Sequence, residues 1–169
     1  MFNRVIALKN KTYPEGTINV SGKNSWKAFF RWEKVLVDEN LSCMEKTFHH
    51  PSSYLDFLSK VANGALLYYD IEYGQWGYEV FSLSKFPIKQ RYWTENLVLP
   101  NTTPLLAFCE LYGENTVLML DTSEKVQRVV EASCFYGPSD WIKVADSLDE
   151  WLDLLILNNG AKYWESTLE

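Results

Sequence analysis

Four short apolar runs follow one another in the second half of the chain, and the links between them are too short for a crossover helix. The runs cover residues 105–112, 116–120, 126–132 and 141–145. Parallel neighbours need a connection of about a dozen residues or more, whereas antiparallel neighbours can be joined by a tight turn such as 113–115. This part of the chain is therefore predicted to form a largely antiparallel sheet.

A helix is predicted after the last of these runs. Ser147 and Glu150 have the spacing of a capping box, which satisfies the free backbone amides at a helix start. Apolar side chains then follow at the i, i+3, i+4 and i+7 positions of one helix face: Leu148, Trp151, Leu152 and Leu155. We expect this face to belong to the core, Gly160 to end the helix and residues 163–164 to fold back onto the body.

A second helix and two strands are predicted in the middle of the chain. The helix begins at Ser52 or Ser53 and stops at Asn63–Gly64, because glycine readily adopts the left-handed conformation that ends many helices. Residues 65–69 are continuously apolar and predict a central strand. Residues 78–83 predict another, with Val80 on one face and Phe81 and Leu83 on the other.

The first 40 residues carry two further patterns. The β-like pieces 5–8 and 17–20 flank a turn, which predicts a hairpin or an added sheet edge within residues 1–24. A helix is predicted from Asn24 or Ser25 to about residue 37, with Trp26, Phe29, Phe30, Leu36 and Val37 on one face of a helical period. Glu33 falls on that face; it is expected to be either a partly buried carboxylate with an arginine or backbone partner, or a charge that contacts another protein.

The whole chain, residues 1–169, is predicted to be a single α+β domain with a twisted, mainly antiparallel sheet of five or six strands and helices packed against it. Residues 86–101 contain two prolines and are predicted to be irregular, with one helical turn at 89–93. A hydrophobic content of 47% and an aromatic content of 15% favour a packed domain with aromatic side chains to spare for its surface.

The charge and the apolar runs restrict the partners. A net charge of −6 makes nucleic acid a poor ligand, because phosphate binding needs clustered lysine and arginine. The same charge suits a basic protein partner, or simple solubility. No run approaches a membrane span and the start has no signal-like apolar stretch, so we expect a cytoplasmic protein that does not bind membranes. The three cysteines, Cys43, Cys109 and Cys134, are expected to be buried free thiols.

No catalytic, metal or cofactor motif is found. His49 and His50 are adjacent and lack nearby cysteine or histidine ligands, so we predict no zinc site. The glycine loops at 74–77 and 136–139 lack the spacing that binds phosphates. We therefore predict neither an enzyme nor a cofactor. A hydrolase remains an alternative, which requires two carboxylates or a Cys–His pair in one cleft.

The loop after the strand at 65–69 combines acidic and aromatic residues. Asp70, Glu72, Tyr73 and Trp76 follow the end of that strand, in a stretch that also contains two glycines. Tyrosine and tryptophan are frequent at binding hot spots, and carboxylates suit a basic partner. These four residues are the candidate partner-binding site; the alternative is an ordinary loop whose tryptophan packs into the core.

Several of these motifs, in this order, resemble the SUKH superfamily. The run from Pro51 through Tyr54, Phe57 and Leu58 to Asn63–Gly64 resembles its "LP-x-x-Y-x-x-F-L…N-G-G" signature. Similar pieces follow at 78–83, 116–121 and 144–152, so that the resemblance covers roughly residues 45–165. The chain departs from the signature at His50, where leucine is usual, and at Ala65, where a second glycine is usual.

The resemblance implies a non-enzymatic α+β domain of the Smi/Knr type, with a twisted antiparallel sheet. Bacterial relatives typically bind and neutralise a cognate toxin domain, often a nuclease or another polymorphic effector, and nuclease toxins tend to be basic. Fungal relatives regulate cell-wall (glucan) synthesis and signalling. We therefore expect an immunity protein whose partner is a basic toxin domain. The alternative is a regulatory scaffold in cell-wall synthesis. The residues leave the oligomeric state open.

Overall fold

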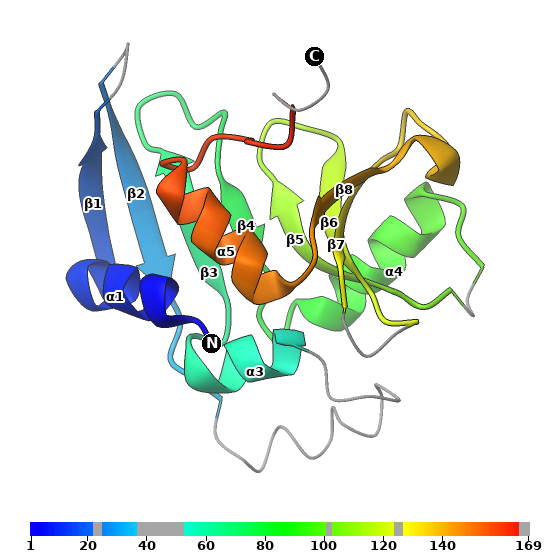
Figure 1. Ribbon diagram of the computed structural model, residues 1–169, viewed down its shortest axis with the longest axis horizontal. Helices are drawn as coiled ribbons and strands as arrows, with labels where there is room; N and C mark the ends of the chain where they lie inside the picture. Colours follow the sequence, from blue (N-terminus) through cyan, green and yellow to red (C-terminus); the bar gives the residue numbers. More distant parts are fainter. Residues whose placement is uncertain (22–24, 37–52, 101–102, 124–126, 166–169) are drawn as a thin grey trace.

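One antiparallel sheet of eight strands dominates the structure, a computed structural model that describes residues 1–21, 25–36, 53–100, 103–123 and 127–165 (Figure 1). The strands are β1 (Glu15–Val20), β2 (Trp26–Trp32), β3 (Ala65–Asp70), β4 (Tyr78–Val80), β5 (Leu105–Leu111), β6 (Thr116–Asp121), β7 (Val129–Ser133) and β8 (Ile142–Ala145). Each strand pairs with the next one in sequence, so the sheet is a continuous meander. The α+β class and the antiparallel pairing are confirmed, but the sheet exceeds the five or six strands predicted.

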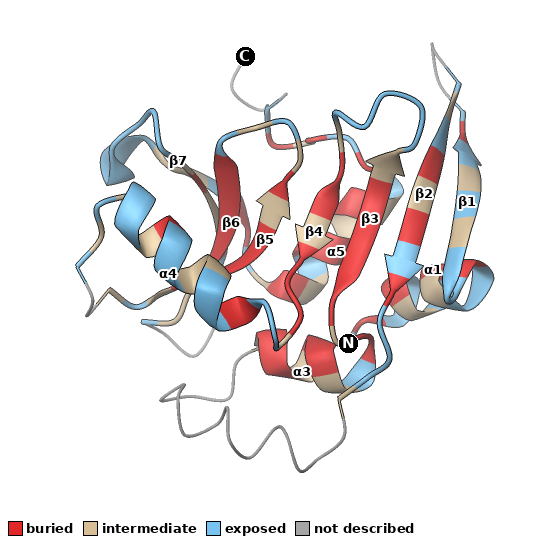
Figure 2. Cartoon of the chain, turned by 180° about the vertical axis from the view of Figure 1, so that it is seen from behind, coloured by how far each residue is buried: buried red, intermediate tan, exposed pale blue. Residues whose placement is uncertain are grey.

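Helices cover the two faces of the sheet unequally. On one face lie α1 (Asn3–Thr12), α3 (Ser53–Lys60) and α5 (Leu148–Leu157), and on the other only α4 (Phe86–Asn96). The larger core fills the first side, and a smaller core around Phe81, Trp93 and Met119 lies on the α4 side. Figure 2 shows the second face, where α4 lies over the β5–β7 side and leaves the β1–β3 side uncovered. None of the helices in the described ranges combines the length and hydrophobicity needed to cross a bilayer.

Helix α5 follows its sequence prediction. The Ser147 side chain accepts a hydrogen bond from the Glu150 amide at 3.1 Å, and the Glu150 carboxylate accepts one from the Asp146 amide at 2.7 Å. All four residues predicted for its apolar face are buried. The chain beyond the helix also folds back, because Trp164 is buried and the Tyr163 hydroxyl donates to the Val144 carbonyl at 3.0 Å.

The predicted helix–strand pair in the middle of the chain is confirmed. Helix α3 begins at Ser53, and the chain turns at Asn63–Gly64 into the buried strand β3. The Asn63 side chain accepts a hydrogen bond from the Leu83 amide at 3.0 Å, which ties this turn to the end of β4. Ser52 lies outside the described residues.

The predictions for the first 40 residues are wrong in two places. Residues 5–8 belong to helix α1, since their spacing of buried side chains at Val5, Leu8 and Thr12 is helical; an apolar run this short does not distinguish the two structures. Residues 26–32 form strand β2, so no helix runs from 25 to 37 in the described part. Alternate residues of β2 face the core, as expected for a strand. Phe29 breaks the alternation of apolar and polar residues in the sequence, because it is apolar but lies on the opposite face, where it pairs with Tyr69.

Glu33 is exposed, directly after β2, so the expectation of a partly buried carboxylate is wrong. Its backbone amide donates to the Gly64 carbonyl at 3.1 Å. The burial prediction depended on a helical face that the chain does not form.

Residues 86–96 form the helix α4 where an irregular segment was predicted. Pro87 stands in the first turn, where a proline costs no hydrogen bond and its fixed backbone angle suits the helix. The proline therefore starts a helix here, and only Phe86 and Trp93 of its residues are buried.

Candidate functional site

The order of the strands brings four separate segments to one end of the sheet. In an antiparallel meander, every connection from an odd to an even strand lies at the same end. The connections β3–β4, β5–β6 and β7–β8 therefore share the upper edge in Figure 1, and the segment after α5 crosses the same edge. We call residues 70–77, 113–115, 134–141 and 159–165 together the acidic rim.

Direct contacts join these segments. The Tyr112 amide donates to the Gly77 carbonyl at 2.9 Å, and the Gln75 carbonyl lies against Gly113. The Tyr78 hydroxyl donates to the Gly160 carbonyl at 3.0 Å, which fixes the segment after α5 beside the β3–β4 connection. The acidic rim is thus one continuous surface built from distant parts of the sequence.

Negative charge is concentrated on the acidic rim. Its carboxylates are Asp70, Glu72, Glu114, Asp140 and Glu165. Its one basic residue is Lys162, so that the formal net charge of these segments is −4 out of −6 for the chain. Opposite charges therefore encounter this end of the molecule preferentially.

Lys162 is buried and occupies the centre of a carboxylate cluster. Its ammonium pairs with Glu114, with Glu165 at 3.1 Å and with Glu131 of β7 at 3.4 Å. Burial disfavours the charged form of this lysine, but the three carboxylates outweigh that penalty, so the pKa of Lys162 is raised above its ordinary value. Because this lysine is enclosed, the outward charge of the acidic rim comes from carboxylates.

The β3–β4 loop is organised by Asp70. One carboxylate oxygen, Oδ1, accepts hydrogen bonds from the amides of Glu72 at 3.0 Å and Tyr73 at 3.3 Å. The Asp70 backbone amide donates to the Trp76 carbonyl at 3.0 Å. This bonding fixes the turn, and it leaves the side chains of Glu72 and Tyr73 exposed.

The four residues predicted from sequence divide into two pairs. Asp70 and Trp76 line one hollow of about 360 Å³, whereas Glu72 and Tyr73 lie outside it. Trp76 packs against the main core and meets the Tyr78 ring edge to face at 5.9 Å, so part of this tryptophan is structural. Tyr73 is 70% exposed, and the adjacent Glu72 carboxylate raises the pKa of its hydroxyl.

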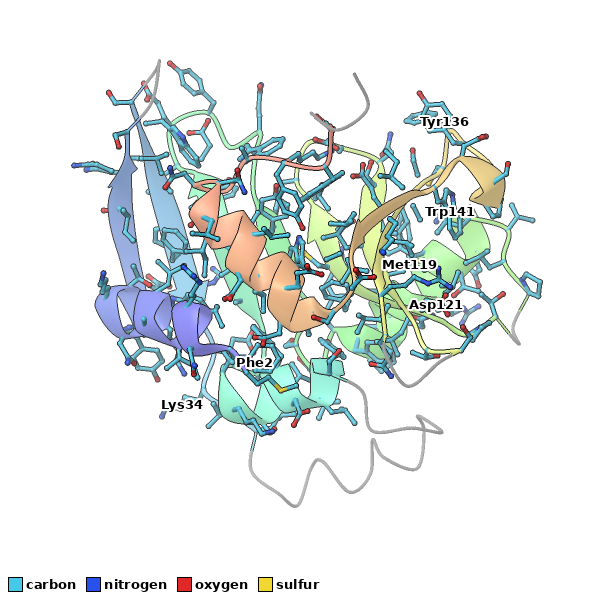
Figure 3. All side chains as sticks on the ribbon, in the orientation of Figure 1. Phe2, Lys34, Met119, Asp121, Tyr136 and Trp141 are labelled. Atoms are coloured by element: carbon cyan, nitrogen blue, oxygen red, sulfur yellow. The ribbon has the colours of Figure 1, made fainter. Side chains whose placement is uncertain are left out.

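Sequence reasoning missed the aromatic residues of the β7–β8 connection. Phe135 and Tyr136 are 72% and 66% exposed, and with the half-buried Trp141 they line a second hollow of about 380 Å³ beside the Lys162 cluster. Figure 3 shows Tyr136 at the tip of this connection, with Trp141 below it. The available signal was a pair of aromatic residues beside a Gly–Pro turn, since large apolar side chains at such a turn have no core to enter.

The described residues contain no group of three or more histidine, cysteine, aspartate or glutamate side chains arranged to hold a metal ion. His49, His50 and Cys43 lie outside these residues. Cys109 is buried, as predicted, and burial raises the pKa of its thiol well above the ordinary range. Cys134 is exposed on the acidic rim, so its predicted burial is wrong.

Comparison with known proteins returns no family. No protein-family model matches the chain, and no curated protein sequence gives a significant match. The resemblance to the SUKH superfamily therefore stays a prediction that depends on the motifs quoted above.

Proposed function

We propose that this chain is a non-enzymatic, cytoplasmic protein-binding domain, an immunity protein of SUKH type that neutralises a toxin by covering it with the acidic rim. The partner class follows from charge: a surface with five carboxylates and one enclosed lysine complements a basic protein. The toxin role itself comes from the family resemblance.

The single observation that carries the proposal is the coincidence of charge and exposed aromatic rings on the acidic rim. Tyr73, Phe135 and Tyr136 are all at least 66% exposed there. Aromatic anchors surrounded by charged groups are typical of binding hot spots with a polar border. The charges would guide the encounter, and the rings would supply the contact area.

Two of the four carboxylates that line the second hollow bear on the alternative of a hydrolase. Glu114 and Glu131 both hold the Lys162 ammonium, and Glu131 also accepts a hydrogen bond from the Trp164 indole. Side chains engaged in this way serve as structural partners of a buried cation. This arrangement favours a binding role over that of an acid–base pair in hydrolysis.

The test is affinity capture from the native cell with three baits. They are the wild-type chain, the double variant Glu72→Lys/Asp140→Lys on the acidic rim, and the control Glu15→Lys. Glu15 is exposed at the start of β1, at the opposite end of the sheet. The proposal predicts that the wild-type and Glu15→Lys baits each capture one basic toxin domain, and that the double variant does not capture it. Capture of cell-wall synthesis proteins instead would favour the scaffold, and equal capture by all three baits would contradict a role for the acidic rim.

A further inference from the structure

The hollow beside Trp76 has the chemistry of a pocket for a positively charged side chain. Its lining residues are Trp26, Asp70, Trp76, Asn159, Gly160 and Ala161. They come from the start of β2, the β3–β4 loop and the segment after α5. Its volume of about 360 Å³ is near the lower limit for small-molecule sites, so it suits one side chain better than a large ligand.

Two tryptophans contribute to the walls. Trp26 and Trp76 are both half-buried and pack against the main core, which fixes their indole rings. Tryptophan is the strongest aromatic partner for a cation, because the face of its ring carries negative charge. Rings that are already held in place lose little freedom when a cation binds.

A carboxylate, that of Asp70, lines the same hollow. Asp70 Oδ1 is bound to the two loop amides, and in the described part of the chain no donor bonds its other oxygen, Oδ2. This oxygen is available to accept a hydrogen bond from a guanidinium or an ammonium group. Asp70 therefore fixes the loop and offers a charge at the same time.

The end of helix α5 adds a second source of negative potential. Asn159, Gly160 and Ala161 follow the C-terminus of this helix, which is the negative end of the helix dipole. The last turn of α5 contains no lysine or arginine, and no basic residue is among those that line the hollow. Among the described residues, none of those that line the hollow supplies a cation to it.

We propose that this hollow receives a lysine or arginine side chain of the partner, held between the Trp26 and Trp76 rings against Asp70. The inference rests on the proposed function, since it names the feature by which a basic partner is recognised. It also explains why Asp70 and Trp76 are brought into one hollow while Glu72 and Tyr73 remain on the open surface.

The test needs no partner protein. The chain, labelled with ¹⁵N, is titrated with N-acetyl-arginine methylamide and with N-acetyl-lysine methylamide, and the indole N–H signals of Trp26 and Trp76 are followed. The corresponding derivatives of citrulline, which has the shape of arginine, and of norleucine, which lacks only the amino group of lysine, serve as neutral controls. We expect saturable shifts of both indole signals with at least one charged probe, and at least about tenfold weaker binding of its neutral counterpart. The stronger of the two charged probes identifies the side chain.

Asp70→Asn is the matched variant, because asparagine keeps the oxygen that binds the loop amides and removes the charge. This variant should weaken binding of the charged probe at least about fivefold and leave the NMR signals of the loop amides unshifted. Equal binding of charged and neutral probes, an unaffected Asp70→Asn variant, or shifts confined to Trp141 would each overturn the inference. Failure here leaves the capture experiment intact, since its variants lie outside this hollow; failure of the capture experiment leaves the probe titration intact.

Discussion

The carbonyl oxygen of Gln75 occupies the space that a Cβ atom on Gly113 would need. This contact packs the β3–β4 loop against the β5–β6 turn. It therefore joins residues 70–77, which were predicted from sequence to bind a partner, to residues 113–115, which were not. Gly113 also has a positive φ of 77°, which disfavours any other residue at this position.

Gly113→Ala should therefore destabilise the protein. The backbone angle alone costs about 1–3 kcal/mol for a residue with a side chain, and the Gln75 carbonyl belongs to the backbone and cannot turn aside. Urea unfolding measures the loss. The control is Gly137→Ala, because Gly137 has a φ of −72° and its nearest neighbour to a new Cβ is the Ser139 hydroxyl at 4.0 Å. A Gly113→Ala variant as stable as Gly137→Ala would contradict the contact.

Replacement of Lys162 by methionine should destabilise the protein, because it removes the cation that pairs with three carboxylates. The variant loses a buried cation and leaves Glu131, which has a side chain only 12% exposed, without its charged partner. We expect a loss of about 1–3 kcal/mol in the free energy of unfolding. Lys143→Met is the control, since its pair with Asp146 is on the surface. Equal stability of both variants would show that the buried cluster contributes nothing.

The effect of Lys162 should also depend on pH in a defined direction. Its pKa is raised in the folded state, so its stabilisation is fully present below the ordinary lysine value near 10.5 and is lost as pH rises through the higher folded value. The stability difference between wild type and Lys162→Met should therefore be constant from pH 7 to about pH 10 and shrink above that. Urea unfolding of both proteins at a series of pH values measures this difference. A stability difference that grows as pH rises would contradict a raised pKa of Lys162.

Glu72→Gln should lower the pKa of Tyr73. The carboxylate repels the phenolate and hydrogen-bonds the neutral hydroxyl, and the variant removes the repulsion. The pKa should fall toward the ordinary value near 10. Ring signals of Tyr73 in NMR, assigned with Tyr73→Phe, report it, and Glu15→Gln serves as the control for a distant charge. An unchanged pKa in Glu72→Gln would mean that the two side chains do not interact.

The elements that could be predicted from sequence are those with a local cause. Helix α5 has a capping box and an apolar stripe, and α3 ends at an Asn–Gly pair, so nearest neighbours determine both. Strand β2 could not be identified, because Phe29 lies on the outer face and fits a helical period equally well. Its outward position follows from pairing with Tyr69, 40 residues away, which no local pattern contains.

The candidate site shows the same division. Asp70, Glu72, Tyr73 and Trp76 are close in sequence, and their composition alone indicated a binding loop. Trp26 is separated from Trp76 by 50 residues, and only the meander order of the strands and the return of the chain after α5 place it at the same hollow. The fold thus adds residues from distant parts of the chain to the binding loop that was predicted from sequence.

The most direct test of the central claim is the rate at which the captured partner associates with the chain. Stopped-flow association is measured over a series of salt concentrations for wild type, Glu72→Lys/Asp140→Lys and Glu15→Lys. If the acidic rim guides a basic partner, the double variant should associate at least about tenfold more slowly at low salt, and the difference should shrink as salt rises. Glu15→Lys should match wild type. Equal rates for wild type and the double variant, or equal slowing by both variants, would contradict binding at the acidic rim.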